Sequence, residues 1–450
     1  MKSFSIAERR QRGKTLRQNV PRTAQGNWAA RADRRDSVEI VECSSRGRLA
    51  HLIPLRYGRM LRSPFTFLRG APALMAADLA HTPQSGIDVQ ACGDCHLVNF
   101  GLFATPERNL IFDINDFDET LHGPWEWDLK RLAASFVVAA RSNGIADQRS
   151  REIVAACGRS YRQHMREFSE MSPLDIWYYR IAADDLIAIA PDAQARRRRE
   201  KLAERARARL GEKLFPKITE QQDGRHRFVE QPPVTTRLTD EKTQEQVREG
   251  MQQYRASLPD DRRYVFDRYR LEDFALRVVG IGSVATRCFV GLFFCDDKNP
   301  LLLQVKEARP SVWEPYAQKC PYEHQGKRVV VGQRLMQAAS DIFLGWAQVG
   351  GHDYFVRQLR DMKFSVPVED LSAAQLGHYA EACGWALARA HAQSGDPAMI
   401  TGYLGRGDKF DVALTVFALA YADQVERDHA AFVAAERAGR IEAVIEPEEP

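Results

Sequence analysis

The sequence predicts an α+β protein. Segments with apolar residues at helical spacing fill most of the chain before residue 264 and after residue 365, and two pairs of β-rich runs lie between them. The 450 residues are 44% hydrophobic and 28% charged, which is ordinary for a globular protein and excludes a mostly disordered or fibrous chain. The formal net charge of +4 is too small for a protein that coats nucleic acid.

The N-terminal segment, residues 1–40, is strongly basic. Its first 36 residues hold ten Lys or Arg and three Asp or Glu side chains, and we expect a solvated, partly ordered tail without a nucleic-acid partner. The segment lacks the apolar core of a secretory signal. No apolar stretch approaches the roughly 18 residues of a membrane span. The eight cysteines are too scattered for a disulfide framework. These features predict a cytoplasmic protein.

Residues 41–263 are expected to form the first part of a helical lobe. A helix is predicted after Pro72, and apolar residues recur at helical spacing in the segment WDLKRLAASFVVAARS. Residues 148–190 are also expected to be helical. They are followed by a charged insertion over about 192–235, in which Arg196–Lys213 predicts an exposed helix.

Residues 264–365 are expected to form a β-rich lobe. The runs CFVGLFF and LLLQVKEA are joined by the turn sequence DDKNP, and IFLGWAQ and YFVRQL flank GGHD in the same way. A helix is predicted between these two hairpins, over Gln325–Ala339. Residues 366–450 return to helical spacing, with an apolar stripe from Leu376 to Ala390, and we expect them to pack onto the first helical segment.

The first group of candidate site residues lies between Asp94 and Asp116. Asp94 and Asn99 belong to GDCHLVN, just before a predicted β-hairpin whose second strand ends near Asp113 and Asp116. Such a hairpin brings Asn99 and Asp116 to one end, where an amide oxygen and a carboxylate suit Mg²⁺. Asp94 is then left to accept a proton, and Asp113 is an alternative metal ligand. A turn whose Asp and Asn residues only cap strands and helices is the competing explanation.

This segment resembles the catalytic segment of aminoglycoside phosphotransferases and protein-kinase-like enzymes. The shared features are GD-x4-N, a strand followed by DF, and WDL at the start of a helix. The resemblance implies that Asp94 is the catalytic residue, that Asn99 and Asp116 bind the metal, and that Asp128 is structural. The sequence departs from the pattern at Cys92, where a His is usual, and in DFD, where DFG is usual.

The second group of candidate residues is a glycine-bearing turn and a lysine, namely Gly280, Gly282, Ser283 and Lys306. The turn precedes the first hairpin of the β-rich lobe, and the lysine lies at the end of that hairpin. Backbone N–H groups of such a turn bind phosphates and a neighbouring Lys neutralises them, which predicts an ATP site. In kinase-like enzymes a third glycine stands where this chain has Ala285, and the Lys pairs with a Glu, for which Glu314 and Glu323 are candidates. An edge-strand Lys without a ligand is the competing explanation.

The order of these two groups is the reverse of that in kinase-like proteins, in which the glycine loop and the Lys come first. In addition, LGHYAEACGWALARAHAQSGD resembles the helix that normally leads into the catalytic segment, yet it lies late in the chain. We therefore predict a circularly permuted, two-lobed kinase-like fold, which is feasible because chain termini often lie close together on the surface. His391 and Asp396 in this helix are either polar site residues or an ordinary helix end.

Nearly the whole chain also looks like a bacterial family, domain of unknown function 2252. It is identified as a member by motifs such as SPFTFLRG, GQRLMQAASD and AHAQSGD. Membership in this family implies no particular reaction.

Two further patterns have more than one interpretation. Cys92, Cys95 and His96 have the C-x-x-C-H spacing of a haem attachment site and also supply three ligands suitable for zinc. Arg357 and Arg360, in the strand after GGHD, either face a phosphate or other anion or form salt bridges along the strand.

The sequence thus predicts an ATP- and magnesium-dependent phosphotransferase that acts on a hydroxyl group of a small molecule or a protein. No motif identifies the acceptor. The alternatives are nucleotidyl transfer (AMPylation) by the same residues, and a nucleotide-binding, pseudokinase-like scaffold without turnover.

Overall fold

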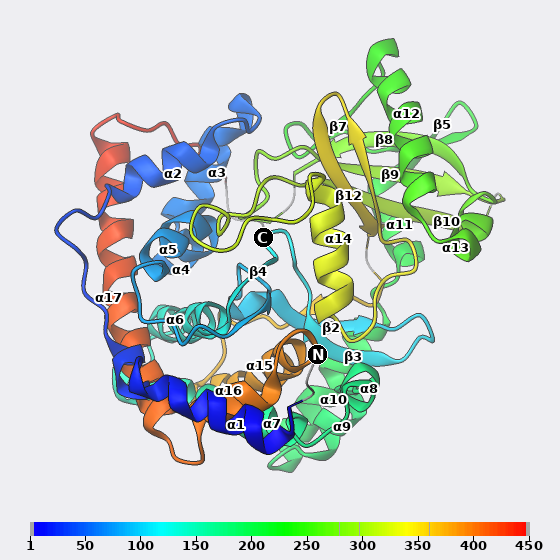
Figure 1. The fold of residues 1–450 in the computed structure, drawn as a ribbon. Coiled ribbons are helices and arrows are strands. Elements are labelled where there is room, and N and C mark those ends of the chain that lie inside the picture. The colour runs from blue at the N-terminus through cyan, green and yellow to red at the C-terminus, as the bar shows by residue number, and fades with distance from the viewer. Residues whose placement is uncertain (1–3, 279, 297, 360, 447–450) are drawn as a thin grey trace.

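The computed structural model describes residues 4–278, 280–296, 298–359 and 361–446. A helical body carries a six-stranded antiparallel sheet at one end (Figure 1), which confirms the predicted α+β class. The strand order in this sheet is β11-β12-β10-β9-β8-β7. Among the helices in the described part of the chain, none is long and apolar enough to cross a membrane.

Helices from two distant parts of the chain form the core of the helical body. The first of them, α6, is buried on all its faces because alanine and large apolar residues cover every side of it. α7 packs along α15, and α17 packs across α6, so the C-terminal helices fold back onto the first helical segment as predicted. The bounds are α6 (Trp125–Ser142), α7 (Asp147–Phe168), α15 (Ala373–Ser394), α16 (Pro397–Leu404) and α17 (Lys409–Arg437).

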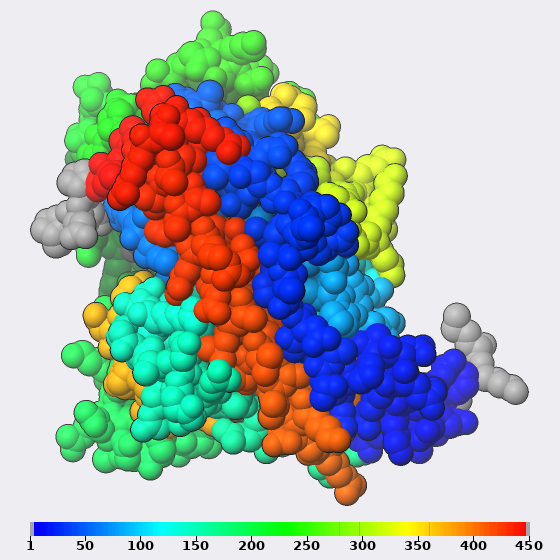
Figure 2. Space-filling model, turned by 90° about the vertical axis from the view of Figure 1, so that its left-hand side faces the viewer, coloured from blue at the N-terminus to red at the C-terminus, as the bar shows by residue number. Residues whose placement is uncertain are grey.

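The N-terminal segment is folded onto this body, so the prediction of a solvated tail is wrong. Its basic side chains have specific partners: Arg34 forms ion pairs with Asp78 and Asp428 at 2.8 and 2.7 Å, and Arg17 donates to the carbonyl of Tyr403 at 2.8 Å. Figure 2 shows the segment running beside α17. The helices of this segment and of the stretch that follows it are α1 (Ile6–Thr15), α2 (Ser37–Ser45), α3 (Ile53–Leu61), α4 (Pro64–Gly70) and α5 (Pro72–Leu79).

The large sheet has a helix on each face. On one face Val247 and Tyr254 of α12 pack against Leu303 and Val305, so the β-rich part begins before residue 264 and includes helices that we assigned to the helical lobe. On the other face lies α14, the predicted helix between the two predicted hairpins. The bounds are β7 (Thr235–Arg237), α12 (Glu241–Ser257), α13 (Asp260–Phe266), β8 (Arg270–Arg277), β9 (Cys288–Phe294), β10 (Pro300–Glu307), α14 (Gln325–Met336), β11 (Gly345–Val349) and β12 (His352–Gln358).

The charged insertion is a series of short elements. Its longest helix, α10, is largely exposed as predicted, whereas Leu214 and Phe228 pack against Val290 and Leu302 of the large sheet. Two short helices, α8 (Pro173–Tyr178) and α9 (Ala183–Ala188), precede it, and its own elements are α10 (Ala193–Arg207), α11 (Gly211–Ile218), β5 (Thr219–Gln222) and β6 (Arg225–Phe228).

Two small antiparallel sheets carry the segment that contains the first group of candidate residues (Figure 1). In one of them β2 pairs with β3, which is the hairpin predicted from the sequence, and β13 adds to the other edge of β2. The strands are β1 (Asp88–Ala91) and β4 (Leu121–Pro124) in the first sheet, and β13 (Phe364–Ser365), β2 (Phe100–Ala104) and β3 (Leu110–Ile114) in the second.

A glycine on α16 permits the close packing of α1 against it. A Cβ atom at Gly402 would lie 2.1 Å from the backbone oxygen of Arg10, which no side chain tolerates without movement of a helix. We expect Gly402→Ala to lower the free energy of unfolding by about 1–3 kcal/mol. The matched control is Gly377→Ala on α15, where a Cβ meets no heavy atom within 4 Å and the helix gains up to about 1 kcal/mol. Chemical denaturation measures both, and equal stability of the two variants would contradict this packing argument.

Candidate functional site

The predicted hairpin does bring the first group of candidate residues together. Residues Leu97–Asn99 form a short 3-10 turn that leads into β2. The side-chain nitrogen of Asn99 donates to the carbonyl of Asp94 at 2.7 Å, and the backbone N–H of Asn115 donates to the carbonyl of Asn99 at 2.7 Å. These bonds fix Asn99 between Asp94 and the end of β3, and they leave its side-chain oxygen as the atom able to bind a cation.

Lys306 meets the acidic end of this hairpin across a sequence separation of almost 190 residues. Its side-chain nitrogen lies 2.5 Å from an Asp118 oxygen and 3.6 Å from an Asp116 oxygen. The lysine is 3% exposed, because β10 runs through the middle of the large sheet and this side chain faces the hairpin. We call Asp94, Asn99, Asp116, Asp118 and Lys306 the polar site.

The carboxylates of the polar site are suited to a cation. Burial alone would raise the pKa of Asp116, but the charges of Lys306, Arg357 and Lys363 outweigh burial and hold this pKa well below its usual range. These charges therefore favour the ionised form of Asp116. Two buried oxygens accept no hydrogen bond within the described residues: the Asp116 oxygen that lies 3.6 Å from Lys306, and one oxygen of Asp118. A buried acceptor without a hydrogen bond is costly unless a ligand or ion completes it.

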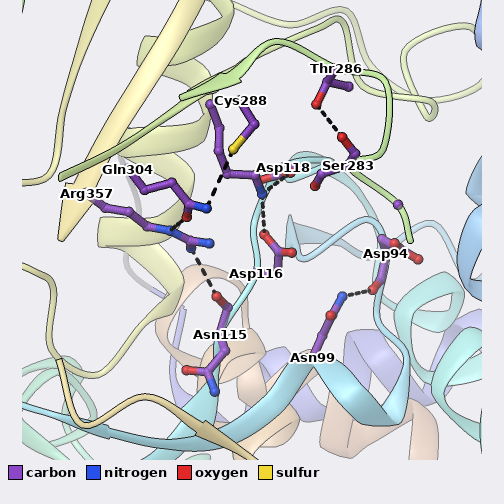
Figure 3. A network of polar contacts seen from close by, with 12 residues as sticks. Asp94, Asn99, Asn115, Asp116, Asp118, Ser283, Thr286, Cys288, Gln304 and Arg357 are labelled. Carbon is purple, nitrogen blue, oxygen red and sulfur yellow. Dashed lines mark hydrogen bonds and ion pairs between the residues drawn. The ribbon is translucent and has the colours of Figure 1, made fainter. Parts of the chain in front are cut away.

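The residues present fit Mg²⁺ bound together with phosphates. Mg²⁺ typically takes one or two protein oxygens and completes its octahedron with phosphate oxygens and water. Asn99 and Asp116, which lie next to each other in Figure 3, supply such a pair. Within the described ranges, no group of three or more His, Cys, Asp and Glu side chains is placed to hold a metal ion. A site made only of protein ligands, such as the zinc alternative at Cys92, Cys95 and His96, therefore has no support there.

Asp94 is held by a buried arginine. The Arg131 guanidinium, on α6, forms an ion pair with one Asp94 oxygen, and the other oxygen lies 3.8 Å from the ring of His96. Burial raises the pKa of Asp94, and this effect exceeds the opposing influence of Arg131. A carboxylate with a raised pKa is a better proton acceptor than an ordinary aspartate, and Asp94 is only partly buried, so a substrate can reach it.

The glycine-bearing turn lies in the loop between β8 and β9. In Figure 3 the part of the loop that carries Ser283 lies on the Asp94 side of the polar site. Ala285, which stands at the place of a third glycine, has φ +66°, a left-handed conformation that glycine adopts most easily. Its carbonyl accepts from the N–H of Leu49 at 2.7 Å, and Arg48 donates to the carbonyls of Gly282 and Val284 at 3.1 and 2.8 Å. The connection between α2 and α3 therefore holds this loop in place.

Asp113 is not part of the polar site. Its side chain is fully buried and accepts hydrogen bonds from Arg389 and from the N–H groups of Ile114 and Ala338, at 3.1, 2.9 and 2.7 Å. The alternation of side chains along β3 turns Asp113 toward α14 and α15. Of the two carboxylates that the sequence left as metal ligands, only Asp116 lies beside Asn99.

Helix α15, in the C-terminal part of the chain, supports the backbone that leads to Asp94. Asp128, on α6, accepts from the N–H groups of Cys92 and Gly93 at 2.6 and 3.0 Å, and His391 lies 3.2 Å from the same carboxylate. His391 therefore acts on the segment before Asp94 through Asp128. Asp396 instead caps α16, where it accepts from two backbone N–H groups.

Sequence reasoning missed three residues at the polar site. Asp118 takes the place of the Glu partner sought for Lys306, so Glu314 and Glu323 were the wrong candidates; the acidic residue in DFD was the available signal. Arg131 and Lys363 carry no sequence signal, because only the fold brings them near. Arg357, considered as an anion-binding residue, lies close to Asp116 (Figure 3), while Arg360 lies outside the described residues.

The fold and the site define an α+β protein with a buried lysine and two aspartates between an antiparallel sheet and a β-hairpin. A model of the family described as uncharacterized protein conserved in bacteria (DUF2252) matches residues 48–435, and the chain belongs to this family. No curated protein and no solved structure matches the chain.

Proposed function

We propose that the chain is an ATP- and magnesium-dependent phosphotransferase, which moves a phosphorus-containing group from ATP to a hydroxyl. The observation that supports this most strongly is the ion pairing of Lys306 with Asp118 and Asp116, because these residues come from parts of the chain that sequence motifs had assigned independently to phosphates and to metal. A lysine, a metal-binding aspartate and a proton-accepting aspartate in one place are what phosphoryl chemistry requires.

Each residue has a separate task in this proposal. Asn99 and Asp116 hold Mg²⁺, which supplies positive charge to the phosphates. Lys306 neutralises phosphate oxygens beneath the turn at Gly280, Gly282 and Ser283, and Asp118 orients Lys306. Asp94 accepts the proton of the attacking hydroxyl while Arg131 fixes its orientation.

The order of elements also agrees with a permuted kinase-like arrangement. In this interpretation the sheet and α14 are the nucleotide lobe, and the helical body, completed by the C-terminal helices, is the catalytic lobe. α15 and α17 pack onto α6 and α7, as they must if the C-terminal helices complete a lobe that the N-terminal half begins.

Binding of Mg-ATP to the wild-type chain and to three variants tests the proposal. We expect Mg-ATP to raise the thermal unfolding midpoint of the wild type, since a ligand at 100 times its Kd adds about 2.7 kcal/mol of stability. Lys306→Met and Asp116→Ala should each abolish this increase. The control Arg334→Gln, which removes a half-buried arginine bonded to the carbonyl of Leu344 on the far end of α14, should retain it.

Three outcomes are informative. If Mg-ATP stabilises neither the wild type nor the control, the nucleotide site is refuted. If both site variants keep the full increase, ATP binds elsewhere. Binding that depends on Lys306 and Asp116 without any consumption of ATP would identify the non-catalytic scaffold instead.

A further inference from the structure

Two more basic side chains, Arg357 and Lys363, lie beside Asp116 and lower its pKa, but neither forms an ion pair with a carboxylate of the described residues. Arg357, at the end of β12, donates to Gln304 at 3.2 Å and to the carbonyl of Asn115 at 3.3 Å. Lys363 donates to the same carbonyl at 2.9 Å. Within the described residues, neither cation forms an ion pair at 4.0 Å or less, so all their polar partners are neutral groups.

The three basic side chains near Asp116 and Asp118 outnumber these two carboxylates. Lys306, Arg357 and Lys363 surround Asp116 and Asp118, and both carboxylates already face Lys306. Burial, which is the largest influence, and then repulsion by the charge of Arg357 lower the pKa of Lys363 to about 7. An added anion would relieve this repulsion.

The position of the two cations identifies which part of a nucleotide they would meet. In Figure 3 Arg357 and Asp94 lie on opposite sides of Asp116 and Asp118. A nucleotide whose reacting phosphorus lies beside Asp94, and which extends past Asp116, would meet Arg357 with its other end, and Lys363 donates to the same Asn115 carbonyl as Arg357.

The charge of that other end depends on how ATP is oriented. If the γ-phosphorus lies beside Asp94, ribose and base reach the two cations and neutralise neither of them. If the α-phosphorus lies beside Asp94, the β- and γ-phosphates reach them, and Arg357 can bind phosphate through two parallel N–H groups. The second orientation gives both half-buried cations an anionic partner, whereas the first leaves them with neutral hydrogen-bond partners only.

We propose that Arg357 and Lys363 bind the terminal pyrophosphate group of a nucleoside triphosphate, so that the group transferred is a nucleotidyl group. The inference rests on the proposed nucleotide site and specifies its reaction. The acceptor hydroxyl oxygen forms a bond to the α-phosphorus, and the bond from that phosphorus to the α,β-bridging oxygen breaks. The electron pair leaves with pyrophosphate, and the hydroxyl proton passes to the Asp94 carboxylate.

Titration of the full-length chain with magnesium pyrophosphate tests the binding part. We expect the wild type to bind pyrophosphate without any nucleoside and in competition with ATP. Arg357→Gln and Lys363→Gln should each weaken this binding by about tenfold or more, since a hydrogen bond between charged groups is lost. Arg334→Gln should bind as the wild type does. Unchanged pyrophosphate binding in both site variants overturns the proposal.

The products of slow ATP hydrolysis test the orientation without knowledge of the acceptor, because water then replaces the hydroxyl. Attack at the α-phosphorus yields AMP and pyrophosphate, as we expect, whereas attack at the γ-phosphorus yields ADP and phosphate and overturns the inference. If ATP is not hydrolysed, the pyrophosphate titration alone decides. ADP formation that depends on Lys306 would leave the proposed function intact and refute only the orientation, whereas failure of Mg-ATP to bind would refute both.

Discussion

Replacing Asp94 by asparagine is expected to leave Mg-ATP binding intact and to slow group transfer by about 10²–10⁴-fold. The asparagine side chain keeps an oxygen that accepts from Arg131, so the buried guanidinium stays bonded. It cannot accept a proton from a hydroxyl. The rate of ATP consumption, measured with the same preparations as the thermal shift, gives the effect on turnover separately from the effect on binding.

A matched control for Asp94→Asn is Asp88→Asn, which changes an aspartate on β1 that is bonded to Gln318 outside the polar site. The control should consume ATP at the wild-type rate. If Asp94→Asn also consumes ATP at that rate, Asp94 is not the proton acceptor. If it loses Mg-ATP binding together with turnover, Asp94 contributes to the nucleotide site itself.

The polar site depends on elements that hold it without contacting a ligand. Asp128 fixes the backbone before Asp94, and His391 on α15 contacts Asp128 in turn. Arg48 and Leu49, between α2 and α3, fix the glycine-bearing turn. Residues before position 50 and after position 390 therefore support a site whose candidate residues all lie between positions 94 and 306.

Local patterns in the sequence predicted the elements well. The hairpins β2–β3, β9–β10 and β11–β12 and the helices α14 and α15 were all anticipated, because each has a clear apolar period or turn signal within its own residues. The fate of the basic N-terminal segment was not anticipated. Its charges suggested solvent, but Arg34 finds Asp78 and Asp428 only when three distant parts of the chain are folded together.

For the polar site too, contacts within one short segment could be predicted, whereas contacts between distant segments could not. Asp94, Asn99 and Asp116 share one hairpin, so their spacing alone indicated that they meet. Asp113 was left as an equal candidate because residue spacing does not reveal which way a side chain at the end of a strand points. The cations at Lys363 and Arg131 escaped notice because a single basic residue on a strand or helix has no distinctive pattern.

Removal of the Arg389 guanidinium is expected to have the largest effect on stability. Arg389 and Asp113 form a 3.1 Å ion pair in which both side chains are fully buried, and Arg389 also donates to the carbonyl of Met336 and to Gln393. Arg389→Met leaves the Asp113 carboxylate in the interior with only two backbone N–H donors. Such an unpaired buried charge costs about 3–5 kcal/mol of unfolding free energy.

The pH dependence of the stability of Arg389→Met shows whether the unpaired Asp113 charge causes the loss. Burial, the largest influence, already raises the pKa of Asp113 in the folded wild type, and loss of Arg389 should raise it further. A folded-state pKa above the unfolded one means that protonation favours the folded state, so the deficit of Arg389→Met should be larger at pH 7 than at pH 5. The double variant Asp113→Asn, Arg389→Met should recover much of the stability at pH 7. A deficit that is equal at both pH values and persists in the double variant would show that Arg389 acts through packing and its carbonyl bond rather than through the Asp113 charge.

Because Asp113 lies only three residues before Asp116, the single variant should also weaken Mg-ATP binding, and the double variant should restore it.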